Sequence, residues 1–112
     1  MFRDDAHLLD ILKAARLAIE FKGPAGKAEF LRDAKTQSAI LHQLLIIGEA
    51  VKRRSPEFRG AHPEVPWKVI AGTRDKLLHF YEGVDLDEVW NMVSSDLPQL
   101  ISHIEPLAPS AA

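Results

Sequence analysis

The sequence contains no cysteine, a single tyrosine and no excess of charge of either sign. The absence of cysteine excludes disulfides, thiolate metal sites and a cysteine nucleophile, and it favours a reducing cytoplasm. Because the net charge is only -2, contact with nucleic acid would need a local basic patch. The longest apolar run, Leu44 to Gly48, is far below the roughly 20 residues of a membrane span. The start of the chain carries acidic residues where a signal peptide carries basic ones, so we expect no targeting segment and no membrane association.

What is present is the composition of one globular domain. The 112 residues are 46% hydrophobic and 27% charged, which is close to the average for globular proteins. A chain of this length buries enough apolar surface to form a core without disulfides or a structural metal. We expect a single domain over residues 1–105 and a disordered C-terminal tail over residues 106–112, where prolines and small residues predominate.

Hydrophobic spacing of three and four residues predicts helices and no strands. We expect four helical stretches, over residues 4–21, 27–54, 66–82 and 85–104. A loop rich in proline is expected over residues 55–66. Short connections between four helices make an all-α, antiparallel four-helix bundle the expected fold.

Two of these stretches depart from simple amphipathic helices. The middle of the second, AILHQLLIIGEAV, is apolar well beyond one narrow face, which indicates either a central place in the bundle or a partner chain. In the last stretch the ring of Pro98 would clash with the carbonyl of Ser94, so a kink or a break is expected there.

Arg74 is the most informative single residue. The apolar stripe of the third stretch includes Trp67 and Ile70. At the next position of the stripe, where helical spacing predicts an apolar side chain, the sequence has Arg74. A buried guanidinium needs a partner. Arg74 has three possible interpretations: it forms a structural salt bridge, its side chain extends to the surface, or it belongs to a functional site.

His79 and Tyr81 follow Arg74 in the same stretch. On an ideal helix Tyr81 lies about 20° from Arg74 around the axis and His79 about 140° away. One helix therefore does not aim all three side chains at one point, unless its last turn loosens or a second copy of the chain supplies the opposite wall. A histidine near a helix C-terminus also complements the helix dipole without any catalytic role.

Other chemical motifs are missing. His7, His42 and His103 are scattered without the spacing of a helical metal site, so no metal is expected. Phosphate-binding glycine loops and the serine nucleophile elbow are also absent from the sequence.

Several segments taken together resemble the HepT-like family of HEPN domains. The central signature is R-x4-H-x-Y, met by Arg74, His79 and Tyr81. Nearly the whole chain follows the family's order of segments: IIGEA at 46–50, VPW at 65–67, IAGTRDKLLHFY at 70–81, VDLDEVW at 84–90 and DLPQL at 96–100.

The resemblance implies an all-helical, dimeric ribonuclease that needs no metal or other cofactor. It also implies the toxin of a type VII-like toxin–antitoxin pair, whose partner is a nucleotidyltransferase antitoxin of the MntA type. By the same resemblance Arg74 and His79 are the catalytic pair, and Tyr81 is where the partner attaches AMP. Asp75 is a supporting residue, at a position where many relatives carry asparagine.

A second hypothesis comes from another functional class. The chain would be a non-catalytic helical module that docks on a nucleotidyltransferase through Arg74 and Tyr81. A third is a bundle that binds a small nucleotide near Arg74. Cleavage of RNA in the presence of EDTA, compared with His79→Ala, separates these hypotheses.

Overall fold

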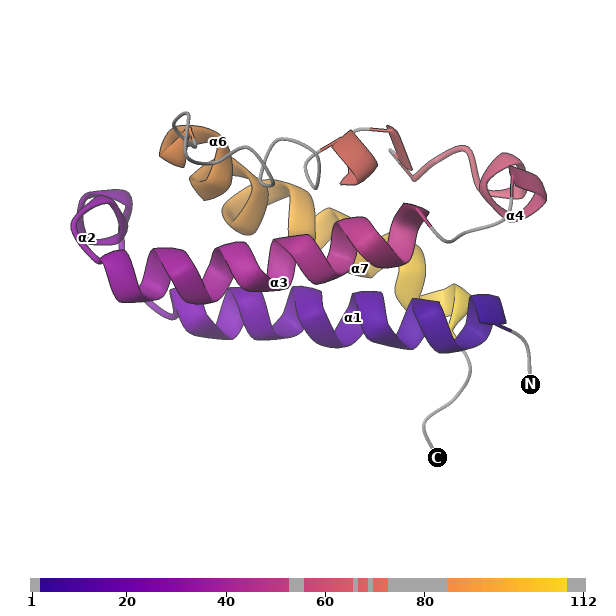
Figure 1. Cartoon of the computed structure of the whole chain (residues 1–112), viewed down its shortest axis with the longest axis horizontal. Coiled ribbons are helices and arrows are strands. Elements are labelled where there is room, and N and C mark those ends of the chain that lie inside the picture. Colours follow the sequence, from indigo (N-terminus) through magenta and orange to yellow (C-terminus); the bar gives the residue numbers. More distant parts are fainter. Residues whose placement is uncertain (1–2, 53–55, 66, 69, 73–84, 109–112) are drawn as a thin grey trace.

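The computed structural model describes residues 3–52, 56–65, 67–68, 70–72 and 85–108, and the regular structure in these ranges is entirely helical (Figure 1). This confirms the predicted all-α class. Residues 67–68 and 70–72 are helical, as predicted for the start of the third stretch. The elements with defined bounds are α1 (Arg3–Lys22), α2 (Lys27–Leu31), α3 (Ala34–Lys52), α4 (Pro56–Ala61), α6 (Leu86–Asn91), a π-helix (Met92–Asp96), α7 (Leu97–Ile104) and a 3-10 helix (Glu105–Leu107).

Helices α1 and α3 lie side by side in opposite directions and form the base of the molecule (Figure 1). The helical run from α6 to α7 packs across them and contacts α1. The core is apolar and combines one stripe from each run: Leu8, Ile11, Leu12, Ala15 and Ala18 from α1; Ile40, Leu44, Ile47 and Val51 from α3; and Val89, Val93, Leu97, Leu100 and Ile104 from the α6–α7 run. Spacing of three and four residues therefore identifies the buried face of α1 and of the α6–α7 run. In α3 the same spacing also allows a stripe through Leu41 and Leu45, and these two side chains are only partly buried.

Helix α1 ends at Lys22, one residue beyond the predicted stretch 4–21. Gly23 has a φ of 57°, in the left-handed region that a residue with a side chain adopts only at a cost. Its N–H donates to the carbonyl of Ile19 at 3.0 Å, which closes the last turn. The chain then turns back to begin α2.

The predicted single helix over residues 27–54 is wrong, because the structure divides it into α2 and α3. Arg32 leaves the helical conformation, with φ -105° and ψ 1°. Asp33 then caps α3: its carboxylate accepts hydrogen bonds from the Thr36 N–H at 3.1 Å and the Thr36 hydroxyl at 2.6 Å. These hydrogen bonds from Thr36 hold the pKa of Asp33 below its usual value. An aspartate followed three residues later by threonine is a helix-start signal that competes with the continuous periodicity.

The predicted loop over residues 55–66 is also wrong in part, since Pro56–Ala61 forms the short helix α4. Pro56 stands at the first helical position, where its missing N–H costs nothing, and Glu57 follows in the first turn. Beyond α4 the chain turns, with the N–H of Val65 donating to the carbonyl of His62 at 3.2 Å.

Pro98 perturbs the last helical run, as predicted. The five residues that precede α7, Met92–Asp96, form a π-helix, and Leu97 donates its N–H to the carbonyl of Met92, five residues back. The wider turn accommodates the proline ring without ending the run. Among the described residues, the buried Ser94 hydroxyl of this π-helix has no hydrogen-bond partner. The π-helix thus keeps Val93 and Leu97 on the core side of one continuous helical run.

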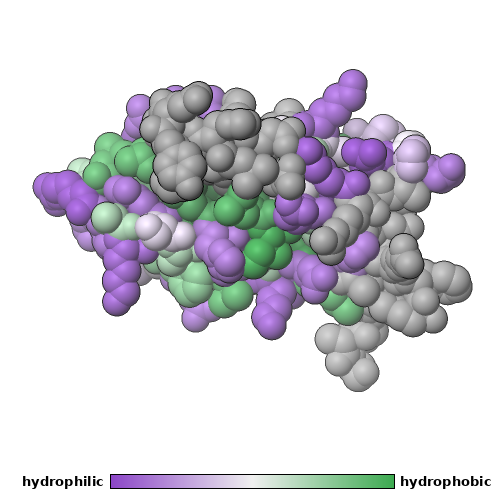
Figure 2. Space-filling view, in the orientation of Figure 1, coloured by the Kyte–Doolittle hydropathy of each residue, from purple (hydrophilic) through white to green (hydrophobic). Residues whose placement is uncertain are grey.

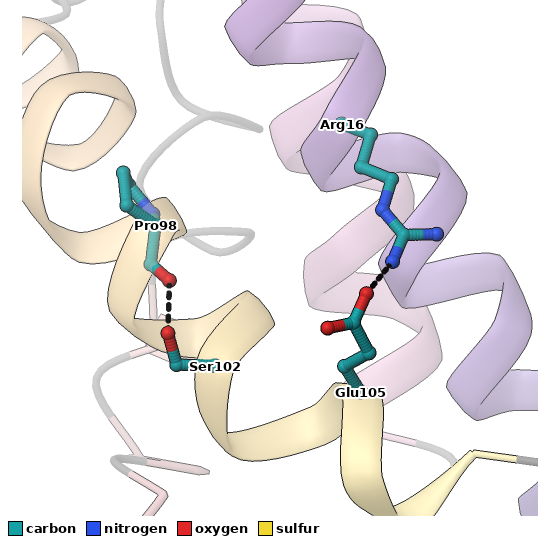
Figure 3. Close-up of polar contacts among 4 residues, drawn as sticks. All are labelled: Arg16, Pro98, Ser102 and Glu105. Atoms are coloured by element: carbon teal, nitrogen blue, oxygen red, sulfur yellow. Dashed lines mark hydrogen bonds and ion pairs between the residues drawn. The ribbon is translucent and has the colours of Figure 1, made fainter.

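Two surface contacts stabilise the C-terminal end of this run (Figure 3). The Ser102 hydroxyl donates to the carbonyl of Pro98 at 3.1 Å, and Arg16 of α1 forms an ion pair with Glu105. Beyond Glu105, Leu107 and Ala108 pack against the core as partly buried residues. The end of the described chain is therefore attached to α1 by both charge and apolar contact.

The N-cap of α6 allows a direct test of local stability. Asp85 accepts the N–H of Asp87 at 2.9 Å and that of Glu88 at 3.3 Å. We expect Asp85→Ala to lower the free energy of unfolding by about 1 kcal/mol, because two backbone donors lose their acceptor. The free energy of unfolding of Asp85→Asn should stay within about 0.5 kcal/mol of the parent value, because asparagine is also a good N-cap residue. Urea denaturation measures both, and equal losses in the two variants would contradict a capping role.

Candidate functional site

The four site residues predicted from the sequence lie outside the described residues. Arg74, Asp75, His79 and Tyr81 all fall within 73–84. The structure does describe the residues on either side of this motif segment.

The residues before the motif segment are anchored in the core. Val65, Trp67 and Ile70 are only 2%, 6% and 7% exposed. The Trp67 indole N–H also donates to the carbonyl of His62 at 2.8 Å, which ties the start of the helix to the preceding turn. The burial of Trp67 and Ile70 confirms the first part of the stripe on which the argument about Arg74 rests.

The residues after the motif segment are anchored as well. Capping by Asp85 fixes the start of α6, and Val89, 3% exposed, inserts into the core. Lys27 of α2 forms an ion pair with Asp87 at 3.0 Å. Both flanks of the segment are therefore attached to the same core.

Aromatic packing reinforces the second anchor. The rings of Phe30 and Trp90 lie 5.6 Å apart between centroids, and the ammonium of Lys22 lies 4.9 Å from the Trp90 ring. Stacked and cation–π contacts of this kind add modest stability beyond burial. They join the end of α1, α2 and α6 at one corner of the molecule.

A second group of chemically versatile side chains gathers around a pocket between α1 and α3. His7 and Asp10 come from α1, and His42 and Glu49 come from α3. The pocket has a volume of about 330 Å³. We call it the α1–α3 pocket. It brings His7 and His42 together although 35 residues separate them in the sequence, whereas His103 lies elsewhere on α7.

The apolar side chains that line the α1–α3 pocket are Leu45, Ile46 and Ala50. Figure 2 shows apolar surface exposed along the middle of the molecule, where α1 and α3 lie side by side. Within the ranges that the structure describes, the Nδ1 atom of His7 is buried and has no hydrogen-bond partner. A buried polar atom of this kind is uncommon and calls for a physical explanation.

Sequence reasoning missed this pocket because its residues come from two helices. Each histidine taken alone had no partner at a helical spacing. The one available signal is the set of polar residues at 42 and 49 on the otherwise apolar second face of α3. They follow each other at seven residues, two helical turns, and so share a face.

Neither a metal site nor a membrane span is found in the described part of the chain. No three histidine, cysteine, aspartate or glutamate side chains within it are arranged to hold a metal ion. None of its helices is long and apolar enough to cross a membrane.

Comparison with known families identifies the class of protein. The chain belongs to the Ribonuclease HepT-like family, whose model matches residues 11–107. The matched range includes the whole motif segment with Arg74, His79 and Tyr81. The family resemblance read from the sequence is therefore confirmed.

Individual relatives agree with this assignment. The chain is 44% identical over 101 residues to the "Probable ribonuclease HepT" of Thermococcus cleftensis, a match that covers 90% of this chain and 92% of that protein. It is 41% identical over 102 residues to the "Putative RNase MJ0127" of Methanocaldococcus jannaschii, covering 91% and 84% of the two chains. It is 38% identical over 101 residues to the "Putative RNase TTE0752" of Caldanaerobacter subterraneus subsp. tengcongensis, covering 90% of each. No solved structure matches the chain.

Proposed function

We propose that this protein is a metal-independent endoribonuclease and the toxin of a type VII-like toxin–antitoxin pair, with Arg74 and His79 as its catalytic residues. The observation that carries the proposal is the family match over residues 11–107, together with the R-x4-H-x-Y motif that falls inside it. The names of the relatives, which describe ribonucleases, support the same activity. RNA is the substrate under this proposal.

The chemistry of RNA cleavage suits these two side chains. RNA carries its own nucleophile, the 2′-hydroxyl, so the enzyme needs only to move protons and stabilise charge. An imidazole titrates near neutral pH and takes a proton from the 2′-hydroxyl or gives one to the leaving 5′-oxygen. The guanidinium of Arg74 binds the phosphate through paired N–H groups and stabilises the negative charge that develops on it. Asp75 has a supporting role beside them.

One catalytic histidine per chain leaves the reaction short of a second proton-transfer group. A two-fold homodimer would bring a second His79 and a second Arg74 to a shared cleft. The second apolar face of α3 supports this arrangement, since Leu41, Leu45 and Ile46 are only partly buried by the rest of the chain. The active protein under this proposal is therefore a homodimer of single-domain chains, each domain spanning residues 1–105 and folded as a four-helix bundle in the cytoplasm.

A nucleotidyltransferase antitoxin of the MntA type is the proposed regulator. In its reaction the Tyr81 hydroxyl oxygen attacks the α-phosphorus of ATP and gives up its proton. A phosphodiester to AMP forms, the bond between the α-phosphorus and the oxygen bridging to the β-phosphorus breaks, and pyrophosphate leaves. The added AMP is bulky and anionic. Under this proposal it competes with the RNA phosphate for Arg74 and blocks access to the cleft.

Catalysis is tested by removing each proposed catalytic side chain. In the presence of EDTA, Arg74→Ala and His79→Ala should each slow RNA cleavage by about a hundredfold or more, because each removes a proton-transfer or charge-stabilising group. Arg32→Ala and His103→Ala remove the same side-chain types from the turn after α2 and from α7, and these variants should cut RNA at the parent rate. An EDTA-treated parent that leaves RNA intact would favour the non-catalytic docking module instead.

The oligomeric state has its own measurement. Light scattering at micromolar concentration should give twice the mass of the chain, because the second apolar face of α3 is then covered by a partner. A monomer at that concentration would contradict the shared-cleft arrangement.

Tyr81 is tested by separating cleavage from regulation. Tyr81→Phe should keep nearly the parent rate of RNA cleavage, since no proton transfer is assigned to its hydroxyl. The same variant should become insensitive to the co-expressed nucleotidyltransferase, because the AMP acceptor is gone. Mass spectrometry of the co-expressed pair maps the adduct, and adenylate on another residue would remove Tyr81 from this role.

A further inference from the structure

The side of α3 that faces away from the core carries an ordered pattern of charge and size. The core side of this helix is buried through Ile40, Leu44, Ile47 and Val51. Away from the core the helix presents side chains that are exposed or half-buried: Lys35, Ser38, Ala39, His42, Leu45, Ile46 and Glu49. We call this set the α3 strip. A helix that carries large apolar side chains on a second face normally packs that face against a partner.

Charge changes sign from one end of the α3 strip to the other. Lys35 lies seven residues before His42, and Glu49 lies seven residues after it. Seven residues fall about 20° short of two helical turns, so the three side chains follow one line along the helix. The strip therefore begins with a cation, ends with an anion and has His42 at its midpoint.

Side-chain size changes along the α3 strip in the same sense. The small residues Ser38 and Ala39 precede His42 by four and three residues, and the large residues Leu45 and Ile46 follow it by three and four. Leu45 and Ile46 pack against the core with only part of their surface. The two halves of the strip therefore differ in size at equal distances from its centre.

A two-fold axis at His42 makes this pattern complementary to itself. The rotation reverses the direction of the helix, so residues equally far before and after His42 lie at the same level across the axis. Lys35 of each copy then meets Glu49 of the other, which gives two ion pairs of opposite charge. At the levels between, the large side chains of each copy pack over the small ones of the other, as in closely packed helix pairs.

A second copy of the chain is the occupant that this pattern favours. An unrelated partner would need a matching surface of its own, whereas the complement of the first half of the α3 strip is present in its second half. The α1–α3 pocket adjoins the strip, because His42, Leu45, Ile46 and Glu49 line it. A copy seated on the strip therefore covers this side of the pocket as well.

We propose that two copies of the chain pair through their α3 strips, with the two helices antiparallel and the two-fold axis at His42. The proposal rests on the homodimer of the proposed function and specifies the face and the register of its interface. Leu45 and Ile46 are buried in it against Ser38 and Ala39 of the second copy.

The absence of cysteine from the chain allows a direct test of the register. His42→Cys places one thiol of each copy at the axis, where the two Cα atoms lie within the roughly 4–7 Å that a disulfide spans. Mild oxidation of the purified protein at micromolar concentration should convert most of this variant into a covalent dimer on a non-reducing gel. The thiols of Ser38→Cys lie about 12 Å apart along the helices, so this control should stay monomeric on the gel. Equal cross-linking of the two variants, or none in either, would overturn the proposal.

Charge reversal tests the ion pairs without thiols. Lys35→Glu and Glu49→Lys should each raise the Kd of the dimer about tenfold or more, because both symmetric pairs become contacts of like charge. The double variant with both changes should return to nearly the parent Kd. Each change places the charge that the helix dipole favours at its end of α3, so α3 itself is not weakened. Single variants that dimerise as tightly as the parent, or a double variant that stays as weak as the single ones, would contradict these pairs.

Cleavage assays on the same variants separate this interface from the ribonuclease activity. A parent that is dimeric and cross-links at position 42 but leaves RNA intact would refute the proposed ribonuclease and support the α3 strip. A dimeric parent that cuts RNA while His42→Cys stays uncross-linked would refute the strip alone. A monomeric parent would contradict the homodimer and the strip together, and would leave this face to a partner other than the chain itself.

Discussion

The apolar contact between α1 and α3 is the interaction on which the rest of the structure depends. Leu8 and Ile11 on α1 and Ile40 and Leu44 on α3 are 0–1% exposed. Each such side chain contributes about 1.5–3 kcal/mol on burial, whereas an exposed ion pair such as Arg16 with Glu105 contributes about 1 kcal/mol or less. The apolar contact therefore determines how the two helices pack, and the other elements are placed on this pair.

The α6–α7 run shows how the same core tolerates an unfavourable residue. A proline inside a helix normally ends or bends it, because the ring displaces the carbonyl four residues back. Here the π-helix Met92–Asp96 widens the turn, and the Ser94 hydroxyl within it is buried with no hydrogen-bond partner in the described part of the chain. Burial of Leu97, Leu100 and Ile104 offsets this local cost. The run consequently stays continuous along one side of the core. Its first helix, α6, is capped by Asp85, the residue that directly follows the motif segment.

The two sides of α3 have different roles. One side forms the core through Ile40, Leu44 and Ile47, and the other carries Leu45 and Ile46, which line the α1–α3 pocket with His42 and Glu49. Under the proposed function, Leu45 and Ile46 lie on the face that a second copy of the chain covers.

The sequence by itself determined the helical class, the buried face of α1 and of the α6–α7 run, and the family, whereas in α3 it did not distinguish Ile40 and Leu44 from the partly buried Leu41 and Leu45. Periodicity at three and four residues selects a helix and its buried face whatever surrounds it, and the R-x4-H-x-Y motif is a linear pattern that the family model matches. The sequence did not predict three other features of the structure, and each has a physical reason. The break at Arg32 and the helix at Pro56–Ala61 result from local capping and a favourable proline, which compete with periodicity by small energies. Only the tertiary structure decided that His7 and Asp10 meet His42 and Glu49, because no spacing along one helix encodes a contact that two antiparallel helices create when they pack.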